Sequence, residues 1–295
     1  MRPIPTLDEF NTMFPDLNAC RQHLKERGIF YSELDCDGCK LPMKRYDEID
    51  VFRCNRSNCQ RKGNRVSIRK GTFFHESSLN CLQILRLAHL WLSKATHETA
   101  MLLSGNSPNT VTAFFSHFRQ LVSAALKEEV QIIGGPGVTV EIDETKLGKR
   151  KYHRGHRVDG IWVLVGIERV ENGKIFLVPL QDRSASTLSD IIAQHVLPGT
   201  TIHTDMWRGY ANLPAMGFTH LKVNHSVSFK DHDIGACTNS AEGLNSGLKR
   251  RIVARNRTAN GIDKHLGEYV WRRQNSKGLF DAFIDALRDI HYDFE

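Results

Sequence analysis

The chain has 295 residues, of which 40% are apolar and 25% charged, and its formal net charge is +7 with an isoelectric point near 9.1. This composition is that of a globular protein rather than a disordered one, and the length suffices for one large domain or two to three smaller ones. No apolar run reaches the roughly 18 residues needed to span a bilayer, and the N-terminus lacks the apolar core of a signal peptide. We therefore expect no membrane partner and no secretion, and the basic balance favours polyanionic partners without identifying them.

The order of motifs predicts five segments. They are an N-terminal helical segment (1–33), a cysteine-rich module (34–75), a helical module (76–131), a linker containing the breaker "IIGGPG" (132–137), and a domain of strands followed by mixed strand and helix (138–295).

Four of the seven cysteines, Cys36, Cys39, Cys54 and Cys59, form a C-x2-C and a C-x4-C pair separated by fourteen residues. Two close pairs joined by a hairpin are typical of tetrahedral Zn²⁺, and four thiolates leave no open position, so the site is predicted to be structural. Four unrelated thiols are the alternative. Many cations surround the cluster, which suits either contact with a DNA backbone or a solvated, charged face.

Residues 79–129 have a helical pattern, and "THETAMLLSGNSPNTVTAFFSHFRQLV" reads as two helices joined by a short turn at Gly105–Ser107. Pro108 suits the first turn of the second helix, with Ser107 or Asn106 as its cap. Apolar residues from Val111 to Val122 form one predicted buried face, which leaves the polar residues, Arg119 among them, to face a DNA groove or water. The pair fits a helix-turn-helix, and a plain helical hairpin is the alternative.

Strands are predicted at 138–143, 161–168, 174–179 and in "TIHTD", and a helix at 187–196. The first strand belongs to "VTVEIDETKLGKR", which alternates apolar and polar residues and then ends in acids and cations. Alternation alone does not rank the three acids of this stretch, Glu141, Asp143 and Glu144.

Distant acids decide the ranking. Asp143 and Asp205 each close a predicted strand, and Glu242 lies on a predicted helix in "TNSAEGLNSGLKRR". These three form the candidate site. Glu141 shares the strand face of Asp143 one step back, and Glu144 points the other way on a continued pleat, so both are second-rank candidates.

Asp143, Asp205 and Glu242 can converge if the two strands are neighbours in one sheet. Three carboxylates in a cleft repel one another and need a counter-ion, which hard divalent cations supply. Two such ions would activate an attacking oxygen and stabilise a leaving one in phosphodiester chemistry. Each acid also has a structural alternative: a solvated strand end for Asp143, a cap on "MWRGY" for Asp205, and a capping box with Asn239 for Glu242.

Taken together, the motifs resemble the Merlin superfamily of cut-and-paste DNA transposases and their bacterial insertion-sequence relatives. The resemblance covers about residues 34 to 290 and is most specific in "VEIDETKLGKRKYHRGHRVDGIWVLVGIER", "IHTDMWRGY", "VNHSVSFKD", "TNSAEGLNSGLKRR" and "EYVWRRQN". The order of zinc ribbon, "RKGTFF", helix-turn-helix and acidic domain also matches. The C-x4-C pair departs from the bacterial relatives, which usually have C-x2-C there.

The resemblance implies a multidomain α+β protein with a zinc ribbon, a helix-turn-helix module and an RNase H-like α/β catalytic domain (138–295) with a mixed central sheet. Its acidic triad maps onto Asp143, Asp205 and Glu242, which would hold two Mg²⁺ (or Mn²⁺) ions, beside one structural Zn²⁺ in the ribbon. Water would cut the phosphodiester at the transposon end, and the freed 3′-hydroxyl would then attack target DNA.

Further residues are expected around this site. His203 and His225 are possible neighbours of it, with a structural hydrogen bond as the alternative for both. The predicted DNA contacts are Lys146, Lys149, Arg150, Lys151, Asn239, Asn245, Lys249, Arg250, Arg251 and Arg119.

The expected partners are double-stranded DNA, as transposon ends and target, and further copies of the chain, because pairing two ends requires at least a dimer. The expected location is the nucleus in a eukaryote, or the cytoplasm and nucleoid in a bacterium. Two other functions stay open: a host DNA-binding protein derived from a transposase without its activity, and a general RNase H-like nuclease.

Overall fold

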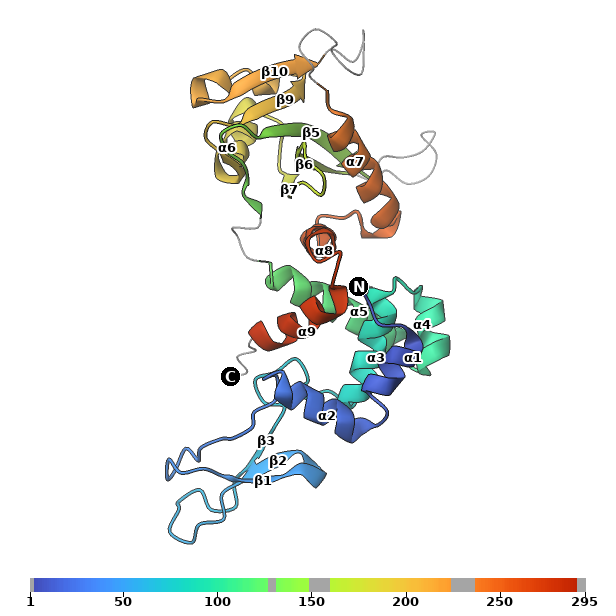
Figure 1. Cartoon of the computed structure of the whole chain (residues 1–295), viewed down its shortest axis with the longest axis vertical. Helices are drawn as coiled ribbons and strands as arrows, with labels where there is room; N and C mark the ends of the chain where they lie inside the picture. The colour runs from blue at the N-terminus through green and yellow to red at the C-terminus, as the bar shows by residue number, and fades with distance from the viewer. Residues whose placement is uncertain (1–2, 127–130, 149–159, 224–236, 291–295) are drawn as a thin grey trace. The chain divides into compact units, whose positions relative to one another are not determined.

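The computed structural model describes residues 3–126, 131–148, 160–223 and 237–290 (Figure 1). It divides into two compact units, the first made of residues 1–125 and 275–295 and the second of residues 126–274. The C-terminal helix α9 (Leu279–Asp289) thus packs with the N-terminal unit, whereas the predicted segment 138–295 grouped it with the later strands.

The first unit contains helices whose N-termini, except that of α9, are capped by a side chain. They are α1 (Leu7–Met13), α2 (Leu17–Glu26), α3 (Cys81–Leu92), α4 (His97–Ser104), α5 (Pro108–Ala124) and α9. Ser107 caps α5 with Pro108 in its first turn, as the sequence predicts. Trp91, Phe118 and Phe283 from three of these helices meet with ring centroids 5.4 to 6.0 Å apart, which explains why α9 belongs to this unit.

The cysteine-rich module forms a small antiparallel sheet within the first unit. Its strands are β1 (Lys44–Tyr46), β2 (Val51–Arg53) and β3 (Arg65–Ser67), in the order β1-β2-β3. The turn between β1 and β2 contains the short helix η1 (Asp47–Ile49) and Asp50, whose φ of 54° is in the left-handed region. Aspartate tolerates this conformation better than most residues.

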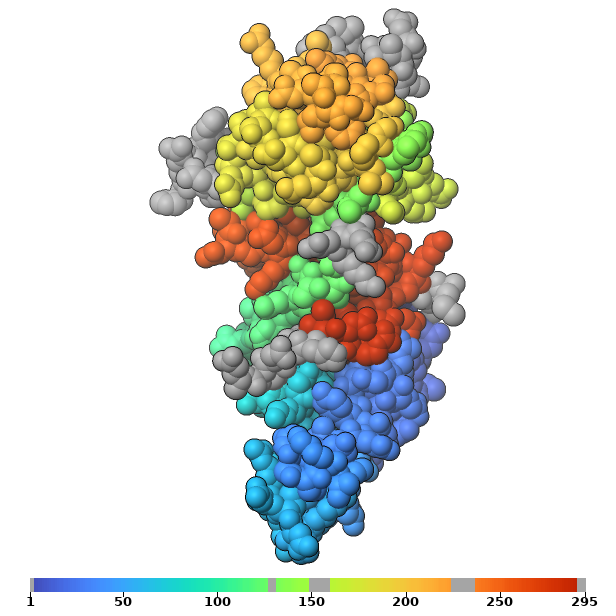
Figure 2. Space-filling model, turned by 90° about the vertical axis from the view of Figure 1, so that its left-hand side faces the viewer, coloured from blue at the N-terminus to red at the C-terminus, as the bar shows by residue number. Residues whose placement is uncertain are grey.

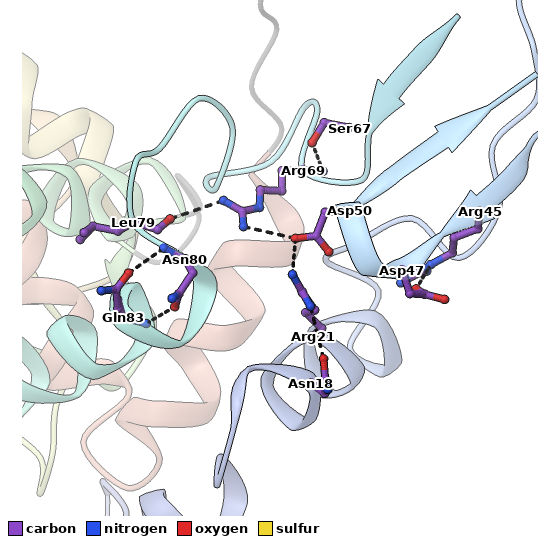
Figure 3. A network of polar contacts seen from close by, with 10 residues as sticks. All are labelled: Asn18, Arg21, Arg45, Asp47, Asp50, Ser67, Arg69, Leu79, Asn80 and Gln83. Atoms are coloured by element: carbon purple, nitrogen blue, oxygen red, sulfur yellow. Dashed lines mark hydrogen bonds and ion pairs between the residues drawn. The ribbon is translucent and has the colours of Figure 1, made fainter. Parts of the chain in front are cut away.

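Asp50 joins this sheet to the helices around it (Figure 3). Its Oδ2 accepts hydrogen bonds from Arg21 of α2 at 2.8 Å and from Arg69 at 3.3 Å. Arg69 also donates to the carbonyl oxygen of Leu79, just before α3. One carboxylate with two guanidinium partners therefore ties the sheet to α2 and to the segment that enters α3.

We expect Asp50→Asn to lower the free energy of unfolding of this unit by about 2 kcal/mol, because two partly buried arginines lose their anionic partner. Asparagine keeps the tolerance for positive φ, so the change isolates the charge. Glu48→Gln is the control, since that side chain is exposed in the same turn, and it should change the stability by less than about 0.5 kcal/mol. Thermal unfolding measures both, and equal effects would contradict the prediction.

The second unit is built on a mixed five-stranded sheet in the order β10-β9-β5-β6-β7. The strands are β5 (Thr139–Leu147), β6 (Ile161–Glu168), β7 (Ile175–Leu180), β9 (Thr201–Asp205) and β10 (Thr219–Val223). β5, β6 and β7 pair antiparallel, whereas β9 runs parallel to both β5 and β10. In the space-filling view the residues from β6 to β10, yellow to orange, form one continuous surface (Figure 2).

Helices cover both faces of this sheet (Figure 1). α6 (Ala185–His195) packs on the face that includes Val140 and Ile142, and α7 (Asn239–Arg251) with α8 (Ile262–Gln274) on the face that includes Leu147. Period-two alternation along β5 sends successive side chains to these two opposite cores. Residues of odd number on β5 therefore face α7.

The predicted strands and helices of this unit are confirmed, but the sequence analysis does not predict β10, and two further differences follow. β5 continues to Leu147, so the acids of "VEIDET" lie within the strand rather than at its end. The predicted linker 132–137 contains β4 (Ile133–Gly134), which pairs with β8 (Val196–Leu197). Among the residues that the structure describes, no helix is both long and apolar enough to cross a membrane.

Candidate active site

Asp143 and Asp205 lie on neighbouring strands of the second unit. The parallel register pairs Glu141 of β5 with His203 of β9. Two residues further along each strand are Asp143 and Asp205, which therefore lie at the same level and on the face that α7 covers. Both are partly exposed.

α7 brings an amide group to this pair. Asn245 is 6% exposed, and its Nδ2 donates to Asp143 Oδ2 at 2.7 Å. The Oδ1 atom of Asn245 is buried and has no hydrogen-bond partner within the described part of the chain. Glu242 is partly exposed and lies one turn before Asn245 on α7, so the two side chains share a helix face.

The structure does not gather the three acids into one tight group. Within the described residues, the four cysteines form the only set of three or more His, Cys, Asp or Glu side chains with ligand atoms within 4.8 Å of one another. Asp205 Oδ1 also accepts the Trp207 backbone N–H at 2.9 Å, so its capping alternative is present. The capping box that the sequence offers for Glu242 is absent, because the N-cap of α7 is Thr238 rather than Asn239.

Behind Asp143 lies a layer of buried polar groups. Glu141 is fully buried and accepts the backbone N–H groups of Ser240 and Ala241 at the start of α7. His203 is 3% exposed, and its Nδ1 lies 3.3 Å from the Cys237 carbonyl oxygen. His203 thus makes the structural contact that the sequence left as an alternative.

Glu144 points to the opposite face from Asp143, as expected from the pleat. Its Oε2 lies 3.5 Å from Arg183, whose guanidinium stacks over Trp162 at 4.1 Å and over Trp207 at 4.5 Å. Burial raises the pKa of Glu144, and the charge of Arg183 opposes that shift. Two aromatic rings and one arginine therefore hold the segment that follows Asp205.

The predicted DNA contacts are distributed over both units. Lys249 and Arg250 are exposed in the last turn of α7, whereas Arg251 donates to Glu268 at 3.0 Å. Lys146 is exposed with its Nζ 5.7 Å from the centre of the Trp162 ring. Asn239 is exposed at the start of α7, and Arg119 is partly exposed on α5 in the other unit. Lys149, Arg150, Lys151 and His225 lie outside the described residues.

The four cysteines of the cysteine-rich module come together as predicted. Sγ–Sγ distances are 3.6 Å for Cys36 and Cys59 and 3.9 Å for Cys39 and Cys54. Four sulfurs about 2.3 Å from one Zn²⁺ would be separated by about 3.8 Å in a tetrahedron, so the cluster fits this ion. The backbone N–H groups of Cys39 and Gly38 lower the pKa of Cys36 to about 6, which favours the thiolate that a metal needs.

Comparison with known proteins identifies the family. The model of the ISXO2-like transposase domain matches residues 133–274. An uncharacterized transposase-like protein of Haemophilus influenzae is 31% identical over 114 residues, which cover 35% of this chain and 84% of the relative. The chain belongs to the ISXO2-like transposase family.

Two solved structures are also similar to this transposase-family chain. The Mos1 strand transfer complex is 10% identical with a TM-score of 0.21, covering 67% of this chain and 78% of the other. A pre-cleavage Mos1 transpososome is 9% identical with a TM-score of 0.20, covering 72% and 80%. Similarity at this level does not establish a shared fold.

Sequence reasoning missed two residues of the transposase domain that surround the acids. Arg183 is a single cation in the loop after β7, and Trp162 is one apolar residue in a buried strand. The sequence around each residue therefore does not indicate that it lies near the acids. Their pairing depends on the sheet order, which brings β5, β6 and the segment after β9 together. Glu141 carried a weak signal, because it shares a strand face with Asp143.

The stability of the transposase domain should fall as the pH is lowered from 7 to 5. Burial, with Lys222 and His203, lowers the pKa of His220 to about 4. The unfolded chain takes up a proton near pH 6.5 and the folded chain only near pH 4, so acid favours unfolding in that window. We expect a loss of about 1 kcal/mol, after allowing for partial exposure.

His220→Gln is the matched variant, because its amide can still bond Thr204 Oγ1, which lies 2.9 Å from His220 Nε2. Its unfolding free energy should depend less on pH between 7 and 5 than that of the natural chain. Identical pH profiles from urea unfolding would contradict this assignment.

Proposed function

We propose that the protein is a cut-and-paste DNA transposase of Merlin type, with an RNase H-like catalytic domain that carries Asp143, Asp205 and Glu242. The observation that supports this most is the placement of Asp143 and Asp205 at one level of one sheet face, with Asn245 of α7 against Asp143. Family membership supports the reaction class.

Carboxylate and amide oxygens are the ligands that Mg²⁺ prefers. Asp143, Asp205 and Asn245 Oδ1, which has no hydrogen-bond partner among the described residues, would supply such ligands, and Glu242 would complete the set by a side-chain movement. When bound, two divalent ions would activate the attacking oxygen and stabilise the leaving one.

The proposed reaction has two steps. In the first, water attacks phosphorus at the transposon end, the bond to the 3′-oxygen breaks, and a 3′-hydroxyl and a 5′-phosphate result. In the second, this 3′-hydroxyl attacks a phosphorus atom of target DNA and displaces the target's own 3′-oxygen. Lys249 and Arg250 would hold the phosphate backbone beside the acids.

The first unit would supply DNA recognition. The ribbon with one Zn²⁺ and the helix pair α4 and α5 would bind the terminal repeats, the latter as a helix-turn-helix with Arg119 facing DNA. Joining two ends requires at least two copies of the chain in the DNA complex.

A supercoiled plasmid with matched terminal inverted repeats tests the proposal. The expected result is Mg²⁺-dependent release of the repeat-flanked segment and its insertion into target DNA. Tight binding of the repeats with no cleavage in Mg²⁺ or Mn²⁺ would instead indicate a DNA-binding protein derived from a transposase. Cleavage that ignores the repeats would indicate a general nuclease.

A further inference from the structure

Glu141 is a buried carboxylate with an unusual number of partners. Its Oε2 accepts the backbone N–H groups of Ser240 at 2.7 Å and Ala241 at 3.0 Å. Its Oε1 lies 3.2 Å from Ser240 Oγ, 3.4 Å from Cys237 Sγ and 3.3 Å from Arg169 Nε. The side chain is fully buried.

These contacts leave Glu141 no room for a metal. A carboxylate offers about four lone-pair positions, and five donor atoms already surround the two oxygens. Glu141 is therefore not a candidate metal ligand.

The partners of Glu141 lie at the start of α7. The first N–H groups of a helix have no partner within the helix, and the N-cap residue Thr238 makes no side-chain capping hydrogen bond to them. A carboxylate from β5 supplies the acceptor, and its charge is favoured at a helix N-terminus. The bond fixes α7 against the strand that carries Asp143 (Figure 1).

We propose that Glu141 is a positioning residue, which holds α7 so that Asn245 and Glu242 face Asp143. The effect of this positioning on metal binding rests on the proposed function. The anchoring itself concerns only contacts within the second unit.

Glu168 offers a matched control. Its carboxylate also accepts two backbone N–H groups, from Gly134 at 3.0 Å and Lys174 at 3.1 Å, in the same unit. Neither of these partners belongs to α7. Glu168→Gln should therefore weaken local structure without moving α7.

The first test is NMR of the full chain without DNA or metal. The side-chain amide signals of Asn245, assigned from their absence in Asn245→Asp, should shift in Glu141→Gln and stay unchanged in Glu168→Gln. Hydrogen exchange at Ser240 and Ala241 should become faster only in Glu141→Gln. Unchanged signals and exchange in Glu141→Gln would overturn the anchoring.

The second test is Mn²⁺ binding measured by EPR, with the Mg²⁺ concentration for half-maximal cleavage beside it. Loss of a group that orients metal ligands typically weakens metal binding by about 10–100-fold. We expect that loss in Glu141→Gln, recovery of cleavage at saturating metal, and less than about a twofold change in Glu168→Gln.

The outcomes separate the possible roles. Equal metal affinity in Glu141→Gln and the natural chain would show that Glu141 is structural only, and would overturn the proposal. Cleavage that saturating metal does not restore would show that Glu141 does more than orient the metal ligands, which also overturns the proposal. If Mn²⁺ binding is weakened in Glu141→Gln as expected but the unsubstituted chain never cleaves DNA, the proposed function is wrong and the positioning role of Glu141 stands. If Glu141→Gln does not fold, Glu141→Asp makes the same test, because it keeps the charge but is one methylene too short.

Discussion

Asp205→Ala should abolish Mg²⁺-dependent cleavage of terminal-repeat DNA. Electrostatic stabilisation by a bound metal ion is worth several kcal/mol in such reactions, which corresponds to a loss of about 10³-fold or more in rate. DNA binding should stay within about threefold, because the proposed binding modules lie in the other unit. A gel assay of cleavage with a parallel binding titration measures both.

Asp190→Ala is the control for this change. Asp190 is an exposed acid on α6, in the same unit but on a helix that covers the opposite sheet face. Its removal should leave the cleavage rate unchanged. If Asp205→Ala kept more than about a tenth of the activity, the assignment of Asp205 would be wrong.

The purified chain should contain about one equivalent of zinc, and Cys54→Ser should lose it, because three thiolates bind less tightly than four. Structural zinc contributes apparent binding free energies of about 10–16 kcal/mol in small zinc-dependent modules, so its loss should unfold the β1 to β3 sheet.

Metal analysis and hydrogen exchange across residues 36–67 measure these two results. Cys81→Ala is the control, since Cys81 is a buried thiol outside the cluster. This variant should keep one equivalent of zinc. Less than about half an equivalent of zinc in the natural chain would contradict a structural site.

Much of the fold could be predicted from local pattern. Alternation located β5, β6, β7 and β9, and the signals Ser107 and Pro108 located the start of α5. These features depend on residues close in sequence, because the spacing of apolar side chains distinguishes strands from helices and capping residues mark where helices begin. The cysteine spacing likewise predicted a cluster that the structure brings together.

The remainder depends on contacts between distant residues. Glu141 receives donors about one hundred positions away, and no local pattern distinguishes its role from that of Asp143. The assignment of α9 to the first unit arises from aromatic packing with Trp91 and Phe118. Arg183 meets Trp162 and Trp207 only because of the strand order.

The most direct test of metal-assisted cleavage at Asp143 and Asp205 is a substrate in which sulfur replaces the 3′-oxygen at the scissile phosphate. Sulfur binds Mg²⁺ poorly and softer ions better. We expect this substrate to be cut in Mn²⁺ but not in Mg²⁺, whereas the natural substrate should be cut in both. Equal cleavage of the sulfur substrate in the two metals would contradict a metal ion at the leaving oxygen.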